Sequence, residues 1–240
     1  MKEFKLLFLD TETTGIDVLV DRLCQVCFKV EDTMRCEYFK PPLPMSVKSM
    51  SITHITNKML EGKVEFKDGQ MKNDLSLLLK DHVLVAHNAK FDIAILGAEG
   101  LAVPTNICTL RVARFLDDKD KIAEYNLQYL KYYLDLEVPG NAHDAEGDVN
   151  VLCAVFDRLL LKMIEKGGDK EKAIEKMIEI SSRPSLYRIF NFGKHKDKTI
   201  EEVKNIDPGY LDWLLAQKKS ANDNDEDWIY TLEYYLGKSK

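Results

Sequence analysis

Acidic residues at close spacing occur at three separate points of the chain, each where an apolar segment ends or a helix is predicted to begin. Asp10 and Glu12 follow the apolar run 5–9, and residues two apart on a strand point to the same face. An aspartate at the end of a buried strand is costly unless a cation or a hydrogen-bond donor accompanies it. The pair is therefore a candidate cation site, with a solvated strand end as the alternative.

The second point is Asp92, which follows a predicted strand over 82–86 and falls in the first turn of a helix predicted over 90–97. Asn88 is expected to cap this helix, and an acid in a first helical turn is favoured by the helix dipole. Taken alone, this segment supports a structural role. His87 is expected to be a packing or supporting residue rather than a metal ligand.

The third point is His143 and Asp148. Five residues along a helix separate two side chains by about 140°, so the two could not share one helical face. Gly140 and Asn141 predict instead a loop that carries His143, followed by a helix over 145–166 with Asp148 in its first turn. A loop histidine can lie over a site that the helix helps to build. An exposed helix cap with an incidental histidine is the alternative.

Size and composition limit the classes of protein to consider. The chain has 240 residues, 45% of them hydrophobic and 31% charged, which is typical of a soluble protein with one substantial core and a small second domain. The net charge of −6 argues against tight, lasting nucleic-acid binding, but not against an enzyme whose carboxylates bind cations. No apolar run is long enough to span a membrane and no signal peptide is evident, so a cytoplasmic location is expected.

The five cysteines are an odd number, and their spacing predicts no disulfide framework. Cys24 and Cys27 form a Cys-x-x-Cys pair, but they lie on a predicted strand, where residues three apart face opposite sides. Both are interpreted as reduced packing residues rather than zinc ligands.

The pattern of apolar residues predicts an α/β fold in which helices cover a mixed sheet. An antiparallel meander is followed by strand–helix units. The predicted strands are 5–9, 24–30, 35–39 and 82–86, and the predicted helices are 74–80, 90–97, 110–116, 127–136 and 145–166. Gly167 and Gly168 end the last helix, so we expect a main domain over 1–165, a connector with a charged helix over 166–184, and a small α+β domain over 185–240.

Each acidic segment is ordinary, but the set resembles the DEDD superfamily of 3′ exonucleases. The resemblance rests on the order and context of Asp10, Glu12, Asp92, His143 and Asp148. Its tyrosine-bearing branch has a tyrosine four residues before the last acid, where this chain has Asp144, so the histidine-bearing branch is the one resembled. The resemblance implies a ribonuclease H-like sheet in which the four acids converge.

Convergence of four carboxylates requires compensating charge. Unit charges about 4 Å apart repel by about 4 kcal/mol at an effective dielectric near 20, and two divalent cations supply the compensation. Carboxylate oxygens favour Mg²⁺ over zinc, and Mn²⁺ is expected to substitute. The resemblance implies that Asp10 bridges both ions, that Glu12 and Asp148 complete the ion on the nucleophile side, and that Asp92 holds the other. His143 is implied as general base.

Other residues are candidates for substrate contacts. Thr13, Thr14 and Ile16 match the family segment that lines the terminal nucleotide, which implies that Ile16 wedges against the last base. Asn88, in the turn before Asp92, is a further candidate.

Residues 51–56 resemble a segment usually written Ile-His-Gly-Ile-Thr in these exonucleases. Here Thr53 and His54 replace the His-Gly pair. His54 is a candidate for stacking on a base, with a surface histidine as the alternative.

The C-terminal region resembles the exodeoxyribonuclease X group within this superfamily. The matching segments are 107–110, 112–114, 183–186, 192–199 and 207–214. The resemblance therefore covers most of the chain. It implies an enzyme of DNA repair that accepts single-stranded and duplex DNA ends.

Three lysines at alternate positions, Lys194, Lys196 and Lys198, would form a basic stripe if this segment were a strand, with Phe190 and Phe192 beside them. A hairpin of solvated lysines is the alternative.

A helix is predicted to begin at Asp207-Pro208, with Asp207 as its cap and proline at its first position. We expect its apolar residues to pack in the small core rather than contact substrate: Tyr210, Trp213 and Leu214.

The function predicted from these features is a 3′→5′ exodeoxyribonuclease that releases nucleoside 5′-monophosphates by two-metal-ion hydrolysis. A 3′ exoribonuclease of the oligoribonuclease or ribonuclease T type is the first alternative, because the same acids and histidine serve RNA. A non-catalytic nucleic-acid-binding module is an alternative of a different class. The sequence does not indicate an oligomeric state.

Overall fold

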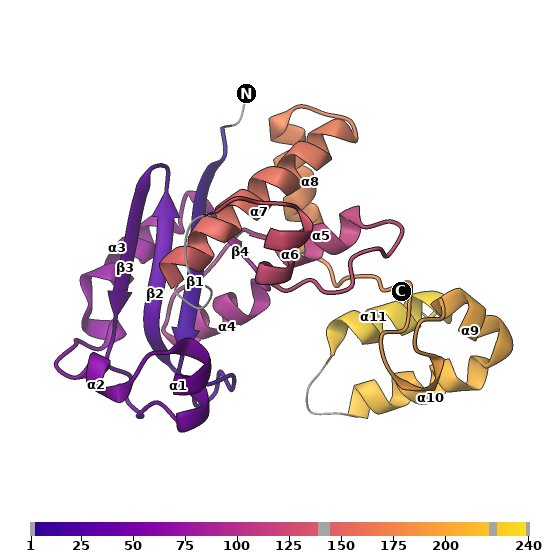
Figure 1. Cartoon of the computed structure of the whole chain (residues 1–240), viewed down its shortest axis with the longest axis horizontal. Helices are drawn as coiled ribbons and strands as arrows, with labels where there is room; N and C mark the ends of the chain where they lie inside the picture. Colours follow the sequence, from indigo (N-terminus) through magenta and orange to yellow (C-terminus); the bar gives the residue numbers. More distant parts are fainter. Residues whose placement is uncertain (1–2, 139–144, 221–224, 239–240) are drawn as a thin grey trace. The chain divides into compact units, whose positions relative to one another are not determined.

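The computed structural model describes residues 3–138, 145–220 and 225–238 (Figure 1). The chain divides into two compact units. The first comprises Met1–Leu116 and Glu124–Ser181, and the second comprises Asp117–Ala123 and Ser182–Lys240. Each unit is described by itself below.

A five-stranded mixed sheet forms the centre of the first unit, in the order β3-β2-β1-β4-β5. Its strands are β1 (Lys5–Thr13), β2 (Leu23–Val30), β3 (Thr33–Tyr38), β4 (His82–Ala86) and β5 (Asn106–Cys108). β1 pairs antiparallel with β2 and parallel with β4, so it joins the meander to the strand–helix half of the sheet. The predicted mixed sheet is confirmed. β5 was not predicted, because a three-residue strand leaves too short a pattern.

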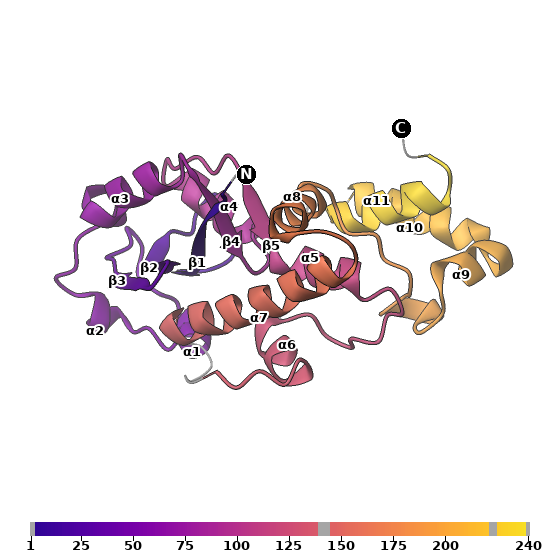
Figure 2. The same ribbon diagram turned by 90° about the horizontal axis from the view of Figure 1, so that it is seen from above.

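Helices cover both faces of this sheet, with α3 on one side and α7 on the other (Figure 2). In chain order the helices are α1 (Val47–Thr53), α2 (Asn57–Leu60), the 3₁₀ helix η1 (Phe66–Asp68), α3 (Gln70–Leu78), α4 (Lys90–Ala98), α5 (Thr109–Leu116), α6 (Leu127–Tyr133), α7 (Ala145–Glu165) and α8 (Lys170–Ser181). The short helices α1 and α2 were not predicted. Ser46 and Thr56 cap them, each side chain accepting a hydrogen bond from a backbone N–H.

α8 is the helix that the sequence assigned to a connector. Its residues Ala173, Ile174 and Met177 are buried, and the helix contacts β5, α5 and α7. α8 therefore belongs to the first unit by its packing.

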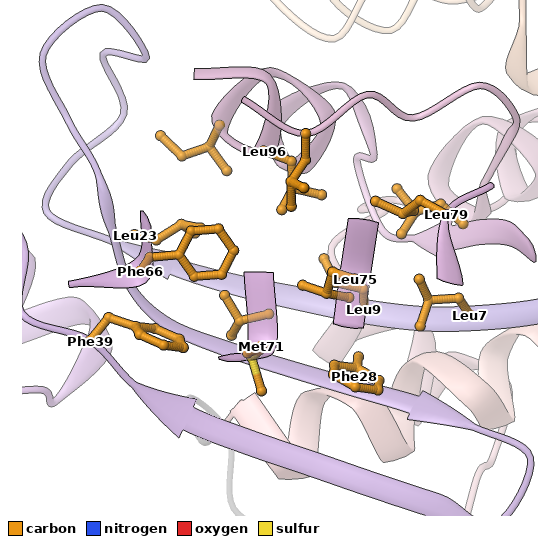
Figure 3. Packing of buried hydrophobic residues seen from close by; sticks show 14 residues of the cluster. Leu7, Leu9, Leu23, Phe28, Phe39, Phe66, Met71, Leu75, Leu79 and Leu96 are labelled. Carbon is orange, nitrogen blue, oxygen red and sulfur yellow. The ribbon is translucent and has the colours of Figure 1, made fainter. Parts of the chain in front are cut away.

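The main apolar cluster lies on the side of the sheet that α3 and α4 cover (Figure 3). Leu7 and Leu9 of β1 are fully buried there against Met71 and Leu75 of α3. On the opposite side, Phe8 packs with Val149 of α7. The alternation of side chains along β1 thus sends successive residues into two different layers.

Cys27 and Cys36 face each other across β2 and β3 and are joined by a disulfide. The expectation of a reduced Cys27 is wrong, because strand pairing brings together two cysteines whose spacing gave no such indication. Cys24 is a free, buried cysteine, as expected.

The second unit is mainly helical. It contains the 3₁₀ helix η2 (Gly193–His195), α9 (Ile200–Ile206), α10 (Pro208–Ser220) and α11 (Glu226–Tyr235). Its β structure, within the described residues, is one isolated bridge between Ile189 and Thr199. Phe190, Leu211, Trp228 and Leu232 are among the residues that form its own small apolar core.

No helix in the described part of either unit has both the length and the apolar character that crossing a membrane would require.

The packing of α3 generates a stability prediction with an internal control. Leu75 is fully buried, whereas Leu77 of the same helix is 62% exposed. We expect Leu75→Ala to reduce the free energy of unfolding by about 2–5 kcal/mol, because it removes buried methyl groups and leaves a cavity. Leu77→Ala should change it by less than about 0.5 kcal/mol. Urea denaturation of both variants checks this, and equal losses would contradict the assignment of α3's buried face.

Candidate active site

The alternation of β1 places two acids on the face that α7 covers. Leu7 and Leu9 point into the main apolar cluster, so Phe8, Asp10 and Glu12 point the other way. Asp10 and Glu12 are both half-buried. The two carboxylates therefore share one face, as the two-residue spacing predicted.

α7 brings Asp148 to the same place. Ala145 and Val149 anchor the first turn of this helix in the apolar layer around Phe8. One oxygen each of Asp10, Glu12 and Asp148 lies within 4.8 Å of the others. A strand and a helix far apart in sequence thus form a triplet of carboxylates with the spacing of metal ligands.

Asp92, in the first turn of α4, lies beside this triplet. Its side chain is 5% exposed, and the Thr11 hydroxyl donates a hydrogen bond to its Oδ1 at 2.8 Å. Its charge acts on both β1 acids, since it contributes to raising the pKa values of Asp10 and Glu12. All four predicted acids therefore belong to one electrostatic group.

The acids resist ionisation in this group. Burial, followed by the charge of Asp92, Glu12 and Asp148, raises the pKa of Asp10 well above its ordinary value. Burial, followed by Asp148 and Asp92, raises the pKa of Glu12 to about 7. Burial also raises the pKa of Asp92 to about 7, against the hydrogen bond from Thr11. At neutral pH the site therefore lacks the positive charge that full ionisation requires.

Gln128 of α6 holds one of the acids from outside the triplet. Its Nε2 donates a hydrogen bond to Asp148 Oδ1 at 2.7 Å. Asn126 fixes the start of α6, because its side chain accepts a hydrogen bond from the Tyr129 N–H. The carboxylate of Asp148 is thus oriented by a short helix with a fixed first turn.

His87 fastens the chain just before α6. Its Nε2 donates to the Tyr125 carbonyl at 2.7 Å, and its Nδ1 lies 2.9 Å from Thr109 Oγ1. Burial lowers the pKa of His87 to about 4, so the ring is neutral at physiological pH. With both ring nitrogens engaged, His87 supports the structure, in keeping with the expectation that it is not a ligand.

Sequence reasoning missed Thr11 and Gln128 as partners of the acids. Thr11 lies between the two β1 acids and differs from them in facing α4. Gln128 is one of several polar residues on α6, and only the tertiary contact distinguishes it.

The predicted terminal-nucleotide residues lie at the end of β1 and in the loop that follows it. Thr13 and Thr14 are buried, and their hydroxyls bond within the loop, to the Gly15 carbonyl at 2.5 Å and to Asp21 Oδ1 at 2.7 Å. A Cβ at Gly15 would collide with the Asp21 carboxylate, so any other residue there would displace that side chain. Ile16 is 87% exposed, which leaves its side chain available for a ligand.

Asn88 and His54 both adopt the left-handed backbone conformation. Asn88, with φ of 59°, precedes the residue that caps α4, Ala89, and no side chain of the described residues caps that end. The expectation that Asn88 caps α4 is wrong, because its backbone makes the turn instead. His54, with φ of 58°, is exposed at the C-terminal end of α1.

The predicted basic stripe is not formed as a strand. Gly193–His195 is a 3₁₀ helix, and Phe190 is buried in the small core. Lys194, Lys196 and Lys198 are exposed, and Lys194 Nζ pairs with the Asp207 carboxylate at 2.6 Å. The 3₁₀ turn allows the aromatic residues to pack compactly. A prediction from alternate positions along a strand does not include such packing.

α10 begins at Pro208 as predicted, but its two aromatic residues differ in burial. Leu214 is buried and Tyr210 packs against the core, whereas Trp213 is 54% exposed. The expectation that Trp213 packs in the core is wrong. Position 213 follows buried Leu211 by two residues, which places it on the outer side of the helix.

His143, the predicted general base, lies outside the described residues, as does Asp144.

Two family models match the chain. The exonuclease model matches residues 7–156, and the exodeoxyribonuclease X-like C-terminal model matches residues 190–219.

Individual relatives give a consistent result. Exodeoxyribonuclease 10 of Escherichia coli (strain K12) is 29% identical over 235 residues, which cover 96% of this chain and 98% of the relative. The PolC-type DNA polymerase III of Thermotoga maritima is 32% identical over 180 residues, which cover 70% of this chain and 13% of the polymerase.

Solved structures share the fold. Exonuclease X in complex with 5′ overhanging duplex DNA matches with a TM-score of 0.57 at 24% identity, covering 73% of this chain and 99% of that one. Escherichia coli exonuclease I in complex with a dT13 oligonucleotide matches with a TM-score of 0.55 at 17% identity, covering 78% of this chain and 47% of that one.

The four acids lie on β1, α4 and α7, all within the stretch that the first family model matches. The chain therefore belongs to the exonuclease family, as a nuclease with an exodeoxyribonuclease X-like C-terminal region.

Proposed function

We propose that the chain is a 3′→5′ exodeoxyribonuclease that releases nucleoside 5′-monophosphates from single-stranded and duplex DNA ends. The observation that carries the proposal is the triplet of Asp10, Glu12 and Asp148, with one oxygen from each within 4.8 Å of the others. Phosphodiester hydrolysis by in-line displacement requires positive charge on both sides of the phosphorus, and clustered carboxylates are the ligands that hold it.

The donor set fits hard divalent cations. It consists of carboxylate oxygens, which suit Mg²⁺ and Mn²⁺. The raised pKa values of Asp10, Glu12 and Asp92 show that their ionised forms are destabilised, and bound cations would stabilise those forms. We propose that Asp10 would help to hold two such ions, with Glu12 and Asp148 at one and Asp92 at the other. When bound, such a pair polarises the attacking water and stabilises the leaving 3′ oxygen.

The remaining chemistry falls to side chains of the chain itself. We assign His143 as the general base that removes a proton from the attacking water, because an imidazole with an ordinary pKa near 6.5 suits this role. Water attacks the phosphorus of the terminal nucleotide, the bond to the 3′ oxygen of the preceding nucleotide breaks, and that oxygen takes up a proton, which yields a nucleoside 5′-monophosphate and a shortened strand with a 3′ hydroxyl. Thr11 and Gln128 keep Asp92 and Asp148 in position throughout.

DNA is proposed as the substrate on the strength of the relative that matches along nearly the whole chain, which is named an exodeoxyribonuclease. Exposed Ile16 is assigned to the terminal base, and the loop backbone around Thr13 and Thr14 to its 3′ end. Further contacts are assigned to His54, Asn88, Lys194, Lys196 and Lys198.

A matched pair of oligonucleotides tests the function directly. With Mg²⁺, a 5′-labelled DNA strand should shorten from its 3′ end one nucleotide at a time, and a chelator should stop the reaction. Asp10→Ala should abolish turnover without loss of fold, because it removes the acid that would help to hold both ions. Release from the 5′ end would contradict the proposal, and faster digestion of the RNA of the same sequence would assign the chain to RNA instead.

Gln128 gives a second prediction. Gln128→Ala should weaken Mn²⁺ binding or activity by about 10–100-fold, because the Asp148 carboxylate loses the donor that orients it. Gln70→Ala is the matched control, since Gln70 Nε2 donates to Asp74 Oδ1 at 2.9 Å on the exposed side of α3. Calorimetric Mn²⁺ titration of both variants measures the effect. Identical isotherms would show that the Gln128 bond does not support the site.

The pKa values predict how stability responds to pH in chelator. Asp92 has its pKa raised from 3.8 to about 7 in the folded chain. Between these values the unfolded chain has lost this proton while the folded chain keeps it, so stability falls as pH rises. Asp92→Asn should therefore stabilise the chain by an amount that grows up to a pH of about 7 and then levels off.

Thermal unfolding across this pH range measures the difference. Asp74→Asn should instead destabilise the chain by an amount that is constant across this range, because the hydrogen bond from Arg35 lowers the pKa of Asp74 below 3.8 and its contribution is complete above that value. A stabilisation by Asp92→Asn that is the same at every pH would refute the electrostatic explanation.

A further inference from the structure

Trp213 is the most unusual exposed side chain of the second unit. It is 54% exposed on α10, although the same helix buries Leu211, Leu214 and Leu215 in the small core. The other tryptophan of the chain, Trp228, is 5% exposed. Large aromatic side chains that stay in water on a folded surface are concentrated at binding sites.

Tyr210 lies one turn before Trp213, and the two rings form a pair. Their centroids are 5.5 Å apart with an angle of 32° between planes. His195, which is buried, contacts the Tyr210 ring edge-on at 4.8 Å. Contact with buried His195 therefore restricts the ring pair. Little side-chain entropy remains to be lost when a ligand binds.

The backbone at Gly193 lies unusually close to the Tyr210 side chain. Gly193 has φ of 70°, and a Cβ there would stand 2.8 Å from the Tyr210 hydroxyl oxygen. Glycine thus meets two requirements at this position: the left-handed conformation and the space for Tyr210.

Positive charge adjoins the rings. Lys194 Nζ lies 5.1 Å from the centroid of Tyr210, within cation–π range. Asp207 holds this ammonium at 2.6 Å and also contacts His195 Nε2 at 2.9 Å, so Lys194 is kept next to the rings. The aromatic–basic surface, defined by Lys194, Tyr210 and Trp213, combines a flat apolar face with a cation at its edge.

We propose that this aromatic–basic surface binds single-stranded nucleic acid, with an unpaired base stacked on Trp213 and the adjacent phosphate near Lys194. The inference rests on the proposed function for the choice of ligand, since a strand undergoing digestion offers planar bases and phosphates in alternation. Stacking on aromatic side chains tolerates any base sequence, which suits an enzyme that removes nucleotides in turn.

The net charge of the chain determines which interaction must hold this occupant. The chain carries a net charge of −6, so phosphate contacts alone would not hold a polyanion, and affinity must come mainly from stacking. The surface would therefore add affinity for a long strand while allowing it to move. The binding constant should fall only weakly as the salt concentration rises, to the extent expected for one or two phosphate contacts.

The first test uses fluorescence of the full chain. Asp10→Asn is included to keep the DNA intact, and an oligo-dT of about 20 nucleotides is the probe, longer than one such single-strand site requires. Because Trp228 is buried and Trp213 is exposed, stacking should quench the emission of Trp213 selectively. Trp213→Phe in the same background should remove the quenching yet retain most of the affinity. Absence of quenching at saturating oligo-dT would overturn the proposal.

The second test uses turnover and separates this inference from the proposed function. For Trp213→Ala, the ratio of kcat/KM on a strand of about 20 nucleotides to that on one of about four should fall by about ten-fold, the equivalent of one lost stacking contact. Tyr234→Ala is the matched control, because Tyr234 is 52% exposed on α11 of the same unit. An unchanged ratio for Trp213→Ala would overturn the inference. Failure of the unaltered chain to digest either strand would instead overturn the proposed function, and the fluorescence titration would still decide the inference.

Discussion

Mutual repulsion among Asp10, Glu12, Asp92 and Asp148 is the constraint around which the first unit is built. Burial raises the pKa values of Asp10, Glu12 and Asp92, and the charges of the neighbouring acids raise those of Asp10 and Glu12 further, so the fold loses stability when these groups ionise. The apolar layers on both faces of the sheet supply the stabilisation that keeps the acids together. The same repulsion creates affinity for cations, so the cost in stability is also the source of the site's chemistry.

The central position of β1 explains how one strand serves both purposes. Leu7 and Leu9 contribute to the apolar layer under α3, whereas Asp10 and Glu12 point toward α7. A shift of one residue would exchange these two sets, turning the acids into the apolar layer under α3 and the leucines toward α7. The register of β1 against β2 and β4 therefore fixes the core and the site at the same time.

Contacts outside the acids complete the geometry. Thr11 holds Asp92 from the other face of β1, and Gln128 holds Asp148 from α6. The neutral ring of His87 fastens the segment before α6. In the second unit a comparable division occurs on α10, which buries its leucines in an aromatic core while Trp213 stays in water. In both units a single element carries core residues on one side and, on the other, residues that we propose face a ligand.

The sequence alone determined the features that depend on local pattern. Alternation and helical periodicity predicted β1 to β4 and α3 to α8 within a few residues, and the spacing of Asp10 and Glu12 predicted that they share a face. Short elements escaped prediction, because β5 and the helices α1 and α2 have too few residues to establish a period.

Contacts between distant segments were decided only by the tertiary structure. The disulfide between Cys27 and Cys36 follows from strand pairing, and the bonds from Thr11 and Gln128 follow from packing of α4 and α6. Strand alternation misplaced Phe190 and the expected helix misplaced Trp213, since burial in a small aromatic core depends on which side of each element meets it. A sequence pattern specifies which side chains share a face, but the partner of that face is set by the free energy of packing the whole chain.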